Sequence, residues 1–255
     1  MCILFIASHQ RKDYPLIIAA NRDEFHARPT QGSHIWSSHP PIFAGKDLQA
    51  GGTWMGVTRG GRISALTNIR KPGSDRQDAI SRGQLVLSYL TSSDNDEQFT
   101  TSMHEHRASY NGFNLLYGNW KSLQVYNNHS GEVEPITAGV HGLSNASLNA
   151  PWPKVSRGVA ALTEYCEHQK VLTEQDLFRL LQDDTQAPDH ALPDTGIEKK
   201  WEKRLSPIFI RSEDYGTRSS TLLLVKRNGS AIWSEQTYLP DGSVADRSRA
   251  HFQFN

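Results

Sequence analysis

Cys2, the second residue of the chain, could supply a nucleophile. A thiolate attacks acyl carbons when a base takes the thiol proton and a nearby positive charge favours the anion. Removal of the initiator methionine, which a small second residue usually permits, would leave on Cys2 an α-amine with a pKa of about 7.7 to 8. If Met1 is retained, that amine is part of a peptide bond and is no base. Cys2 could equally be a small buried hydrophobe, as most free cysteines are.

The elements around Cys2 place a polar cluster beside it. Residues 2–7 and 15–20 are short apolar runs, separated by a polar stretch at 8–14. This pattern predicts an antiparallel hairpin of buried strands. In such a hairpin the start of the first strand lies beside the end of the second, so Cys2 should neighbour the four polar residues 21–24.

Composition limits the function classes. The chain has 255 residues, 37% of them hydrophobic, and equal numbers of basic and acidic residues, 27 of each. We expect a single domain over residues 1–255, and the absence of a basic stripe argues against nucleic acid as a partner. Cys2 and Cys166 lie far apart, which argues against a disulfide framework and fits a reducing compartment. No apolar run approaches a transmembrane length, so we expect a cytoplasmic protein without a membrane span.

Hairpins and helices alternate in blocks along the rest of the chain. Glycines at 60 and 61 separate two alternating runs and predict a hairpin over 51–68, and residues 113–127 predict another. Residues 36–46 indicate an irregular strand pair interrupted by two prolines, and we expect this segment to be a loop crossing the face of the sheet. Helices are expected at 81–90, 94–106, 153–169 and 173–182, and further strands at 133–140, 206–211, 217–226, 231–238 and 250–254. Strands joined by hairpins and separate helices indicate an α+β protein with antiparallel sheets.

Six motifs closely resemble the Asn-Arg-Asp-Glu (NRDE) family over nearly the whole chain. They are Met1-Cys2, Asn21-Arg22-Asp23-Glu24, Arg28-Pro29, Gly51-Gly52-Thr53-Trp54-Met55-Gly56, Thr67-Asn68 and His141-Gly142-Leu143-Ser144-Asn145. Members of that family have been linked to Golgi organisation and secretion, to haem trafficking, and to acyl-coenzyme A and lipid metabolism. The resemblance implies a ligand site at these motifs, and we assign to it Asn21, Arg22, Glu24, His26, Arg28, Trp54 and Asn68.

A more distant similarity connects the chain to the choloylglycine hydrolase and penicillin acylase group of N-terminal-nucleophile hydrolases. It implies a four-layer αββα sandwich of antiparallel sheets. It also implies catalytic roles for Cys2 as nucleophile, Asp23 as the residue that holds the α-amine, Asn145 at the oxyanion and Arg218 near the thiolate. The sequence departs from that group at Ala20, where an arginine is common, because the arginine here is Arg22.

Less specific roles for the same residues stay open. Asp23 could form a structural ion pair with Arg22, Asn145 could satisfy turn backbone, and Arg218 could be a surface residue. Arg22 and Arg28 could also hold a phosphate or carboxylate without any turnover.

No metal site is expected, because His104-Glu105-His106 lacks further ligands at zinc-like intervals. No cofactor is required. Haem is conceivable as cargo, with His26 as the histidine next to the polar cluster, although most scattered histidines are surface or hydrogen-bonded groups.

Two functions follow for one cleft, which we expect Cys2, Asn21, Arg22, Asp23, Asn68, Asn145 and Arg218 to line. The first is a non-catalytic binder or carrier of haem or of an acyl-coenzyme A or lipid-related metabolite. The alternative is an N-terminal-cysteine amidohydrolase or thioesterase acting on a small acylated substrate. The partner is a small molecule in both, and the sequence leaves the oligomeric state open.

Overall fold

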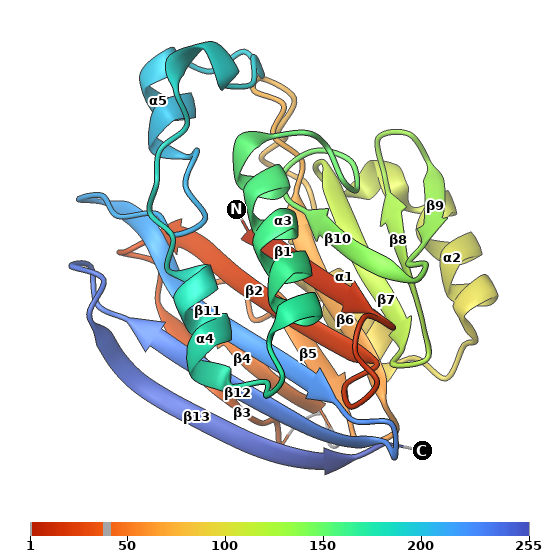
Figure 1. The fold of residues 1–255 in the computed structure, drawn as a ribbon. Coiled ribbons are helices and arrows are strands. Elements are labelled where there is room, and N and C mark those ends of the chain that lie inside the picture. The colour runs from red at the N-terminus through yellow and green to blue at the C-terminus, as the bar shows by residue number, and fades with distance from the viewer. Residues whose placement is uncertain (1, 38–41, 255) are drawn as a thin grey trace.

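Two antiparallel sheets stack face to face (Figure 1) in the computed structural model, which describes residues 2–37 and 42–254. The six-stranded sheet has the order β10-β1-β2-β11-β12-β13, and the seven-stranded sheet runs β3 to β9 in chain order. The strands of the first are β1 (Cys2–Ser8), β2 (Leu16–Phe25), β10 (Gly139–Leu143), β11 (Tyr215–Val225), β12 (Ser230–Tyr238) and β13 (Val244–Gln253). Those of the second are β3 (Thr30–Ile35), β4 (Ile42–Asp47), β5 (Met55–Thr58), β6 (Arg62–Asn68), β7 (Phe113–Asn119), β8 (Ser122–Asn127) and β9 (Glu132–Pro135).

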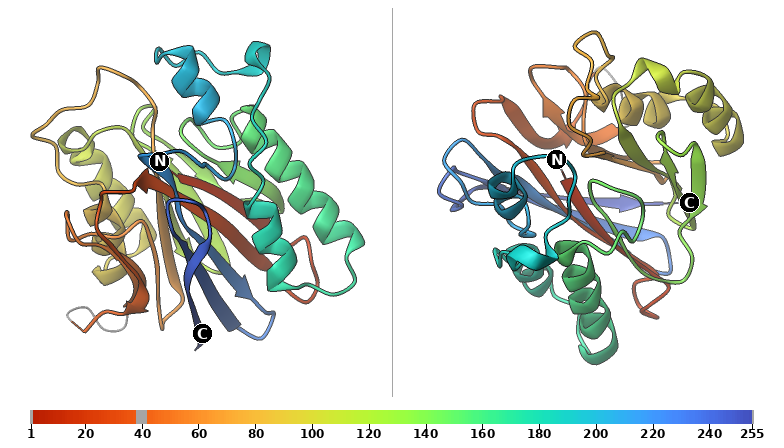
Figure 2. Two further views of the ribbon diagram at one scale, coloured as in Figure 1. Left: turned by 90° about the vertical axis from the view of Figure 1, so that its left-hand side faces the viewer. Right: turned by 90° about the horizontal axis from the view of Figure 1, so that it is seen from above.

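Helices cover the outer faces of both sheets (Figure 2). α3 (Pro153–His168) and α4 (Glu174–Leu181) pack on the six-stranded sheet, through a cluster that includes Phe5, Leu162 and Leu177. α1 (Gly83–Thr91) and α2 (Asp96–Glu105) pack on the seven-stranded sheet. The result is the expected α+β sandwich of four layers.

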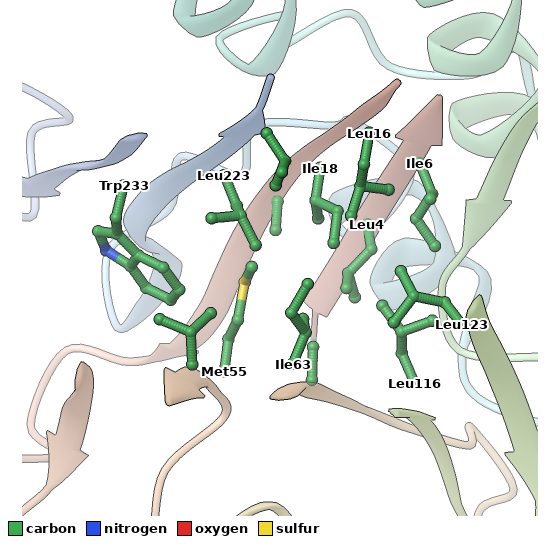
Figure 3. Close-up of a cluster of buried hydrophobic side chains, with 14 of the residues drawn as sticks. Leu4, Ile6, Leu16, Ile18, Met55, Ile63, Leu116, Leu123, Leu223 and Trp233 are labelled. Atoms are coloured by element: carbon green, nitrogen blue, oxygen red, sulfur yellow. The ribbon is translucent and has the colours of Figure 1, made fainter. Parts of the chain in front are cut away.

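The two sheets share one apolar core (Figure 3). Leu4, Ile18 and Trp233 enter it from the six-stranded sheet, and Met55 and Leu116 enter it from the other. Because side chains alternate along a strand, β1 and β2 send every second residue into this core and the others toward α3 and α4. Buried on both faces, the two strands read in sequence as continuous apolar runs.

Most elements agree with the sequence prediction. The hairpins β1–β2, β5–β6 and β7–β8 form as expected, and so do α1 to α4. The N-cap of α2 is Asn95, in a capping box with Gln98, and Thr173 caps α4. Side chains that stabilise helix ends in this way are the local reason why the helix starts could be predicted.

Three expectations were wrong. Residues 36–46 contribute one strand, β4, where a strand pair was expected, and they form no loop over the sheet, because β4 pairs with both β3 and β5 inside it; residues 38–41 lie outside the described residues. Residues 206–211 form no strand, and the short helix α5 (Lys199–Arg204), together with single 3-10 turns at Arg107–Ser109 and Asp189–Ala191, was not anticipated. The meander also stops at β9, because β10 crosses to the other sheet and pairs with β1.

In the described part of the chain, no helix is both long and apolar enough to cross a membrane.

Helix α3 approaches β1 at Gly158, and this contact yields a stability prediction. A Cβ on Gly158 would lie 2.0 Å from the Phe5 ring, which is fully buried. Gly158→Ala should therefore lower the free energy of unfolding by about 1–3 kcal/mol, despite the better helix propensity of alanine. The urea midpoint measures this change.

Ser156→Ala is the matched control, because Ser156 is an exposed residue of the same helix. It should leave the midpoint unchanged or raise it slightly. Equal midpoints for both variants would show that the packing of α3 on β1 is looser than described.

Candidate functional site

Strand pairing places Cys2 beside the polar cluster. In the β1–β2 register Cys2 lies opposite Arg22, so their side chains share the face that looks toward the other sheet. The Ser144 hydroxyl at the end of β10 donates to the Cys2 carbonyl at 3.2 Å and fixes the start of β1 from its other side. The hairpin predicted from sequence therefore brings the thiol and the arginine together.

A pocket of about 550 Å³ opens at this end of the sandwich. Its walls come from the ends of β1, β2, β4 and β6 and from the segment before α1. The lining residues are Cys2, Arg22, Asp23, Glu24, Arg28, Asp47, Gln49, Ala50, Thr53, Trp54, Leu66, Asn68, Gln77, Ala79, Ile80, Ser81, Arg82, Gly83 and Asn111. We call this the Cys2 pocket.

Arg22 forms the inner wall of the Cys2 pocket and is 5% exposed. Its guanidinium lies over the Trp54 ring, 4.5 Å from the centroid, and donates to the Thr30 hydroxyl at 3.1 Å. The nearest carboxylate, that of Glu24, is 3.9 Å away. Stacking fixes the plane of the guanidinium, while the long ion pair leaves donor capacity for a ligand.

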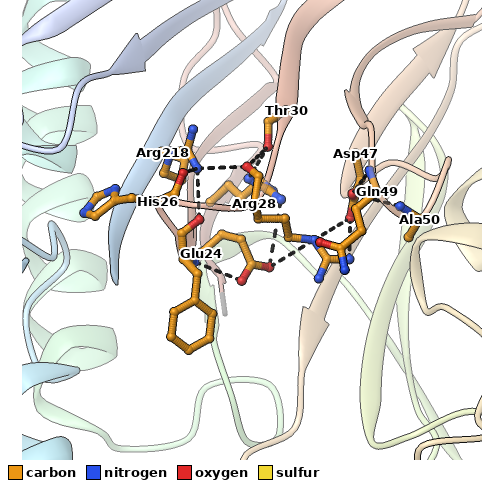
Figure 4. Close-up of polar contacts among 10 residues, drawn as sticks. Glu24, His26, Arg28, Thr30, Asp47, Gln49, Ala50 and Arg218 are labelled. Atoms are coloured by element: carbon orange, nitrogen blue, oxygen red, sulfur yellow. Dashed lines mark hydrogen bonds and ion pairs between the residues drawn. The ribbon is translucent and has the colours of Figure 1, made fainter. Parts of the chain in front are cut away.

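Arg28 and Asp47 form the rim of the pocket (Figure 4). Arg28 contacts Asp47 Oδ2 through two nitrogens, at 2.9 and 2.7 Å. Burial alone would raise the pKa of Asp47, but the bond from Arg28 and backbone N–H donors hold that pKa below its ordinary value. Glu24 lies 3.9 Å from Arg28 and completes the rim.

Arg82 lines the same pocket from another part of the fold, directly before α1. A Cβ on Gly52 would lie 2.6 Å from the Gly83 carbonyl carbon, so only glycine lets the two chains approach this closely. Arg82 donates to the Gly112 carbonyl at 3.1 Å, and its carboxylate neighbour Asp75 is 3.9 Å away. Burial lowers the Arg82 pKa, and the charges of Asp75, Glu24 and Cys2 oppose that effect. Arg82 therefore faces the same space as Arg22.

The thiol itself is not activated. Cys2 keeps some exposed surface, but protein atoms surround the sulfur closely enough that desolvation raises its pKa above 9.0. The charge of Asp23 raises the pKa further, whereas the charge of Arg22 and a hydrogen bond from the Asp23 backbone N–H lower it. Desolvation dominates, so the thiol is protonated at neutral pH.

Asp23 points to the opposite face of β2, toward the helices. It is 1% exposed and accepts a hydrogen bond from the Thr217 hydroxyl at 2.7 Å. Desolvation raises the pKa of Asp23, and the charge of Lys154 opposes that rise. Lys154, in the first turn of α3, is 2% exposed and donates to the Leu205 carbonyl at 3.2 Å. Burial lowers its pKa to about 8.

A buried ion pair lies behind these two residues. Arg70 contacts Glu202 of α5 at 2.5 Å and stacks on Trp152, 4.8 Å from the ring centroid. Glu202 is 3% exposed and also accepts hydrogen bonds from the backbone and hydroxyl of Thr195. The unexpected helix α5 is thus anchored over the start of β1 by charge (Figure 1).

Seven of the eleven residues predicted from the sequence line the pocket: Cys2, Arg22, Asp23, Glu24, Arg28, Trp54 and Asn68. The structure brings the arginines, the thiol and the tryptophan around one space. Their roles in binding or catalysis stay predictions.

Asn21 and Asn145 do not line the pocket. Asn21 faces the helices, where it donates to the carbonyls of Leu181 and Ile208 at 2.8 and 2.9 Å and accepts from Ser220. The Asn145 amide donates to the Asn68 carbonyl at 2.9 Å. Both predictions of a cleft-lining side chain are corrected, since each amide is used to hold neighbouring backbone in place.

Arg218 and His26 are also turned away. The register shift between Thr217 and Ser219 marks a β-bulge at Arg218, which re-aims its side chain. Its guanidinium donates to the carbonyls of Phe25, His26 and Arg28 and so supports the loop after β2 (Figure 4). The His26 Nε2 lies 3.0 Å from the Ser212 carbonyl.

Sequence reasoning missed Arg82 and Lys154. Arg82 lies in the first turn of the helix predicted at 81–90, although α1 begins only at Gly83, and nothing in the sequence marks it as a pocket residue. Lys154 follows Pro153 in the first turn of α3, and its position next to apolar Val155 was the available signal.

The described residues contain no group of three or more metal-ligand side chains. Among the described residues that line the Cys2 pocket, Cys2 is the one side chain of an axial haem-ligand type.

Solved structures with the same architecture define the fold class. A conjugated bile acid hydrolase variant (C2A) from Clostridium perfringens is 9% identical, with a TM-score of 0.53, and the match covers 100% of this chain and 97% of that one. The Caenorhabditis elegans orthologue of N-acylethanolamine-hydrolyzing acid amidase is also 9% identical, with a TM-score of 0.50 over 88% and 92% of the two chains. The chain therefore has the N-terminal-nucleophile hydrolase fold.

Sequence relatives identify the family. The Transport and Golgi organisation 2 family model matches residues 1–240. The mouse Transport and Golgi organization 2 homolog is 35% identical, with 94% of each chain covered, and the human homolog is 33% identical over 99% of this chain and 96% of its own. The protein belongs to the Transport and Golgi organisation 2 family, as its motifs indicated.

The raised thiol pKa yields a test of Cys2 reactivity. In a Cys166→Ser background, alkylation of Cys2 by iodoacetamide should be slow at pH 7 and rise steeply above pH 9, because only the thiolate reacts. Mass spectrometry of the modified protein measures the rate at each pH.

Removing the second cysteine is necessary because burial raises the Cys166 pKa to about 11, and its alkylation would overlap at high pH. Fast alkylation that does not change between pH 6 and 8 would contradict the protonated thiol.

Proposed function

We propose that the protein binds or carries a small anionic acylated metabolite of the acyl-coenzyme A kind in the Cys2 pocket, without turning it over. The observation that carries this proposal is the pair of arginines, Arg22 and Arg82, that line one pocket from different parts of the fold, the end of β2 and the segment before α1. Each has its carboxylate neighbour at 3.9 Å, beyond hydrogen-bonding distance. An anionic group between them would gain two charge-assisted contacts.

The state of Cys2 favours binding over catalysis. Its pKa is raised, the Asn145 amide donates one hydrogen to the Asn68 carbonyl, and Arg218 supports a loop. Acyl transfer needs an ionised nucleophile and donors aimed at the developing oxyanion. Of the four residues assigned to catalysis, Cys2 and Asp23 line the pocket, but the Asp23 carboxylate points to the opposite face of β2 and accepts from Thr217.

The space beside Cys2 favours a short acyl group. A recess lined by Cys2, Leu4, Ala20, Met55 and neighbours leaves about 10 Å³, enough for about one water molecule. The apolar core is thus closed to a long chain.

Haem remains the other cargo that the resemblance implies. Cys2 is its one candidate axial ligand among the described pocket residues, since His26 lies elsewhere. The paired charges along the walls suit a polar ligand better than a porphyrin face.

Isothermal titration with a short-chain acyl-coenzyme A tests the proposal. Arg82→Gln should weaken binding at least about tenfold, because a charged contact to the anion is lost. Arg227→Gln is the matched control: it changes an exposed arginine in the turn after β11, at the opposite end of the sheet, and should leave the affinity unchanged. Equal affinities of the Arg82→Gln and Arg227→Gln variants would contradict the proposed binding site. Binding of haem but not of the thioester would identify haem as the ligand.

Hydrolysis by Cys2 is the second candidate function, favoured by the fold and by the position of Cys2 in the pocket. The thiolate would attack the acyl carbon, form a thioester to Cys2 and release the thiol or amine, which takes the proton. Water would then cleave that thioester and restore the cysteine. The α-amine of Cys2 would be the base if Met1 is absent.

Intact mass distinguishes the two functions. A carrier should show no acyl adduct after incubation with short acyl thioesters and amides, and the ligand should be recovered unchanged. A stable or transient acyl adduct on Cys2, absent from Cys2→Ala, would establish the hydrolase instead.

A further inference from the structure

A second, basic pocket lies on the far side of Asn111 from the Cys2 pocket. It encloses about 440 Å³ and is lined by Lys71, Ser74, Arg76, Arg107, Ala108, Tyr110, Asn111, Gly112, Asn128 and His129. Four of these side chains are cationic or can become so, and none of these lining residues is acidic. In a chain with no net charge, such a concentration of one sign indicates a site for an anion.

One chain segment separates the two pockets. The Asn111 side chain accepts from the Arg76 N–H at 2.8 Å and donates to the Arg76 carbonyl at 3.0 Å, so it holds this segment at its middle. Residues before this point, Lys71 and Ser74, line the basic pocket. Residues after it, from Gln77 onward, line the Cys2 pocket.

A direct contact also joins the two sites. Arg82 of the Cys2 pocket donates to the carbonyl of Gly112, which lines the basic pocket. A ligand that crosses Asn111 would therefore meet Arg82 on one side and the basic side chains on the other.

The cationic side chains of the basic pocket are available to bind an anion, because no strong ion pair within residues 2–37 and 42–254 holds them. Arg76 pairs with Asp78 at 3.4 Å, but both side chains are at least half exposed, and such pairs are weak. Arg107 lies near the Tyr126 side chain, where its charge opposes the rise in the Tyr126 pKa that burial causes. Among the described residues Lys71 and Arg107 have no carboxylate within ion-pair distance.

The groove between α4 and β13 suits an anion less well. It also holds arginines, Arg179, Arg247 and Arg249, but Glu174 and Glu235 line it with them. Glu174 already pairs with Arg249 at 2.8 Å.

We propose that the basic pocket binds a terminal phosphate group of a ligand whose acyl end lies beside Cys2 and whose other anionic group lies between Arg22 and Arg82. This inference rests on the proposed function and adds to it a second site, which holds the far end of the same ligand. An arginine guanidinium can donate two parallel hydrogen bonds to the oxygens of one phosphate. Because Asn111 lines both pockets, one extended molecule would pass over it from one pocket to the other.

The test compares two ligands that differ only at that end. Isothermal titration uses a short-chain acyl-coenzyme A and the same acyl group on pantetheine, which lacks the nucleotide. The double variant Arg76→Gln/Arg107→Gln should weaken binding of the acyl-coenzyme A at least about tenfold and leave acyl-pantetheine unchanged. Raising the salt concentration should lower the affinity of the wild-type protein for acyl-coenzyme A toward that of the double variant, because salt screens exposed charged contacts.

Two controls keep the outcome interpretable. Arg227→Gln should match the wild-type protein with both ligands, and an unchanged urea midpoint shows that the double variant folds. Equal affinity of the double variant and the wild-type protein for acyl-coenzyme A would overturn the basic site while the Cys2 pocket stands. If neither ligand binds the wild-type protein, the proposed function fails, and this inference fails with it.

Discussion

The pleat of β2 is the constraint on which the site depends. This strand lies between β1 and β11, so its register is fixed on both sides and its side chains must alternate. Arg22 and Glu24 therefore face the Cys2 pocket, whereas Asn21 and Asp23 face the helices. A one-residue slip would place the arginine among α3 and α4 and the buried Asp23 beside the thiol. The four-residue motif thus consists of two pairs: Arg22 and Glu24 are placed to contact a ligand, and Asn21 and Asp23 support the fold.

The charges around Cys2 are arranged in two layers that cannot replace each other. On the helix side, Lys154, Asp23, Arg70 and Glu202 are all nearly inaccessible to water, and such groups are tolerated only with partners. That layer connects α3 to the end of β2 and α5 to the segment after β6. On the pocket side, Arg22 and Arg82 have their carboxylate neighbours at 3.9 Å, whereas Arg28 pairs closely with Asp47. We infer that the first layer fixes the position of Cys2 and that the second sets what can approach it.

Periodicity explains what could be predicted from the sequence and what could not. The hairpins and four of the helices follow local patterns, and the pairing of Cys2 with residues 21–24 follows from the first hairpin alone. The prediction that Arg218 lines the pocket was wrong because a one-residue bulge changes the direction of its side chain, and a bulge has no signature in composition. The prediction for Asn21 was wrong because Asn21 and Arg22 are consecutive residues of β2, so their side chains point to opposite faces and only one of them can line the pocket. Arg82 could not be predicted as a pocket residue because its position depends on the contact between Gly52 and Gly83. These two residues are 31 positions apart, and only the folded chain brings them together.

The electrostatics of the pocket set binding and covalent chemistry against each other. The charge of Arg22 lowers the pKa of the Cys2 thiol and partly offsets the effect of burial. An anion bound between Arg22 and Arg82 would cancel some of that positive charge and exclude water from the sulfur. Both effects raise the thiol pKa further and leave the nucleophile protonated while the ligand is present. A fold that elsewhere presents a reactive cysteine would in this way hold a thioester next to a thiol without transferring its acyl group.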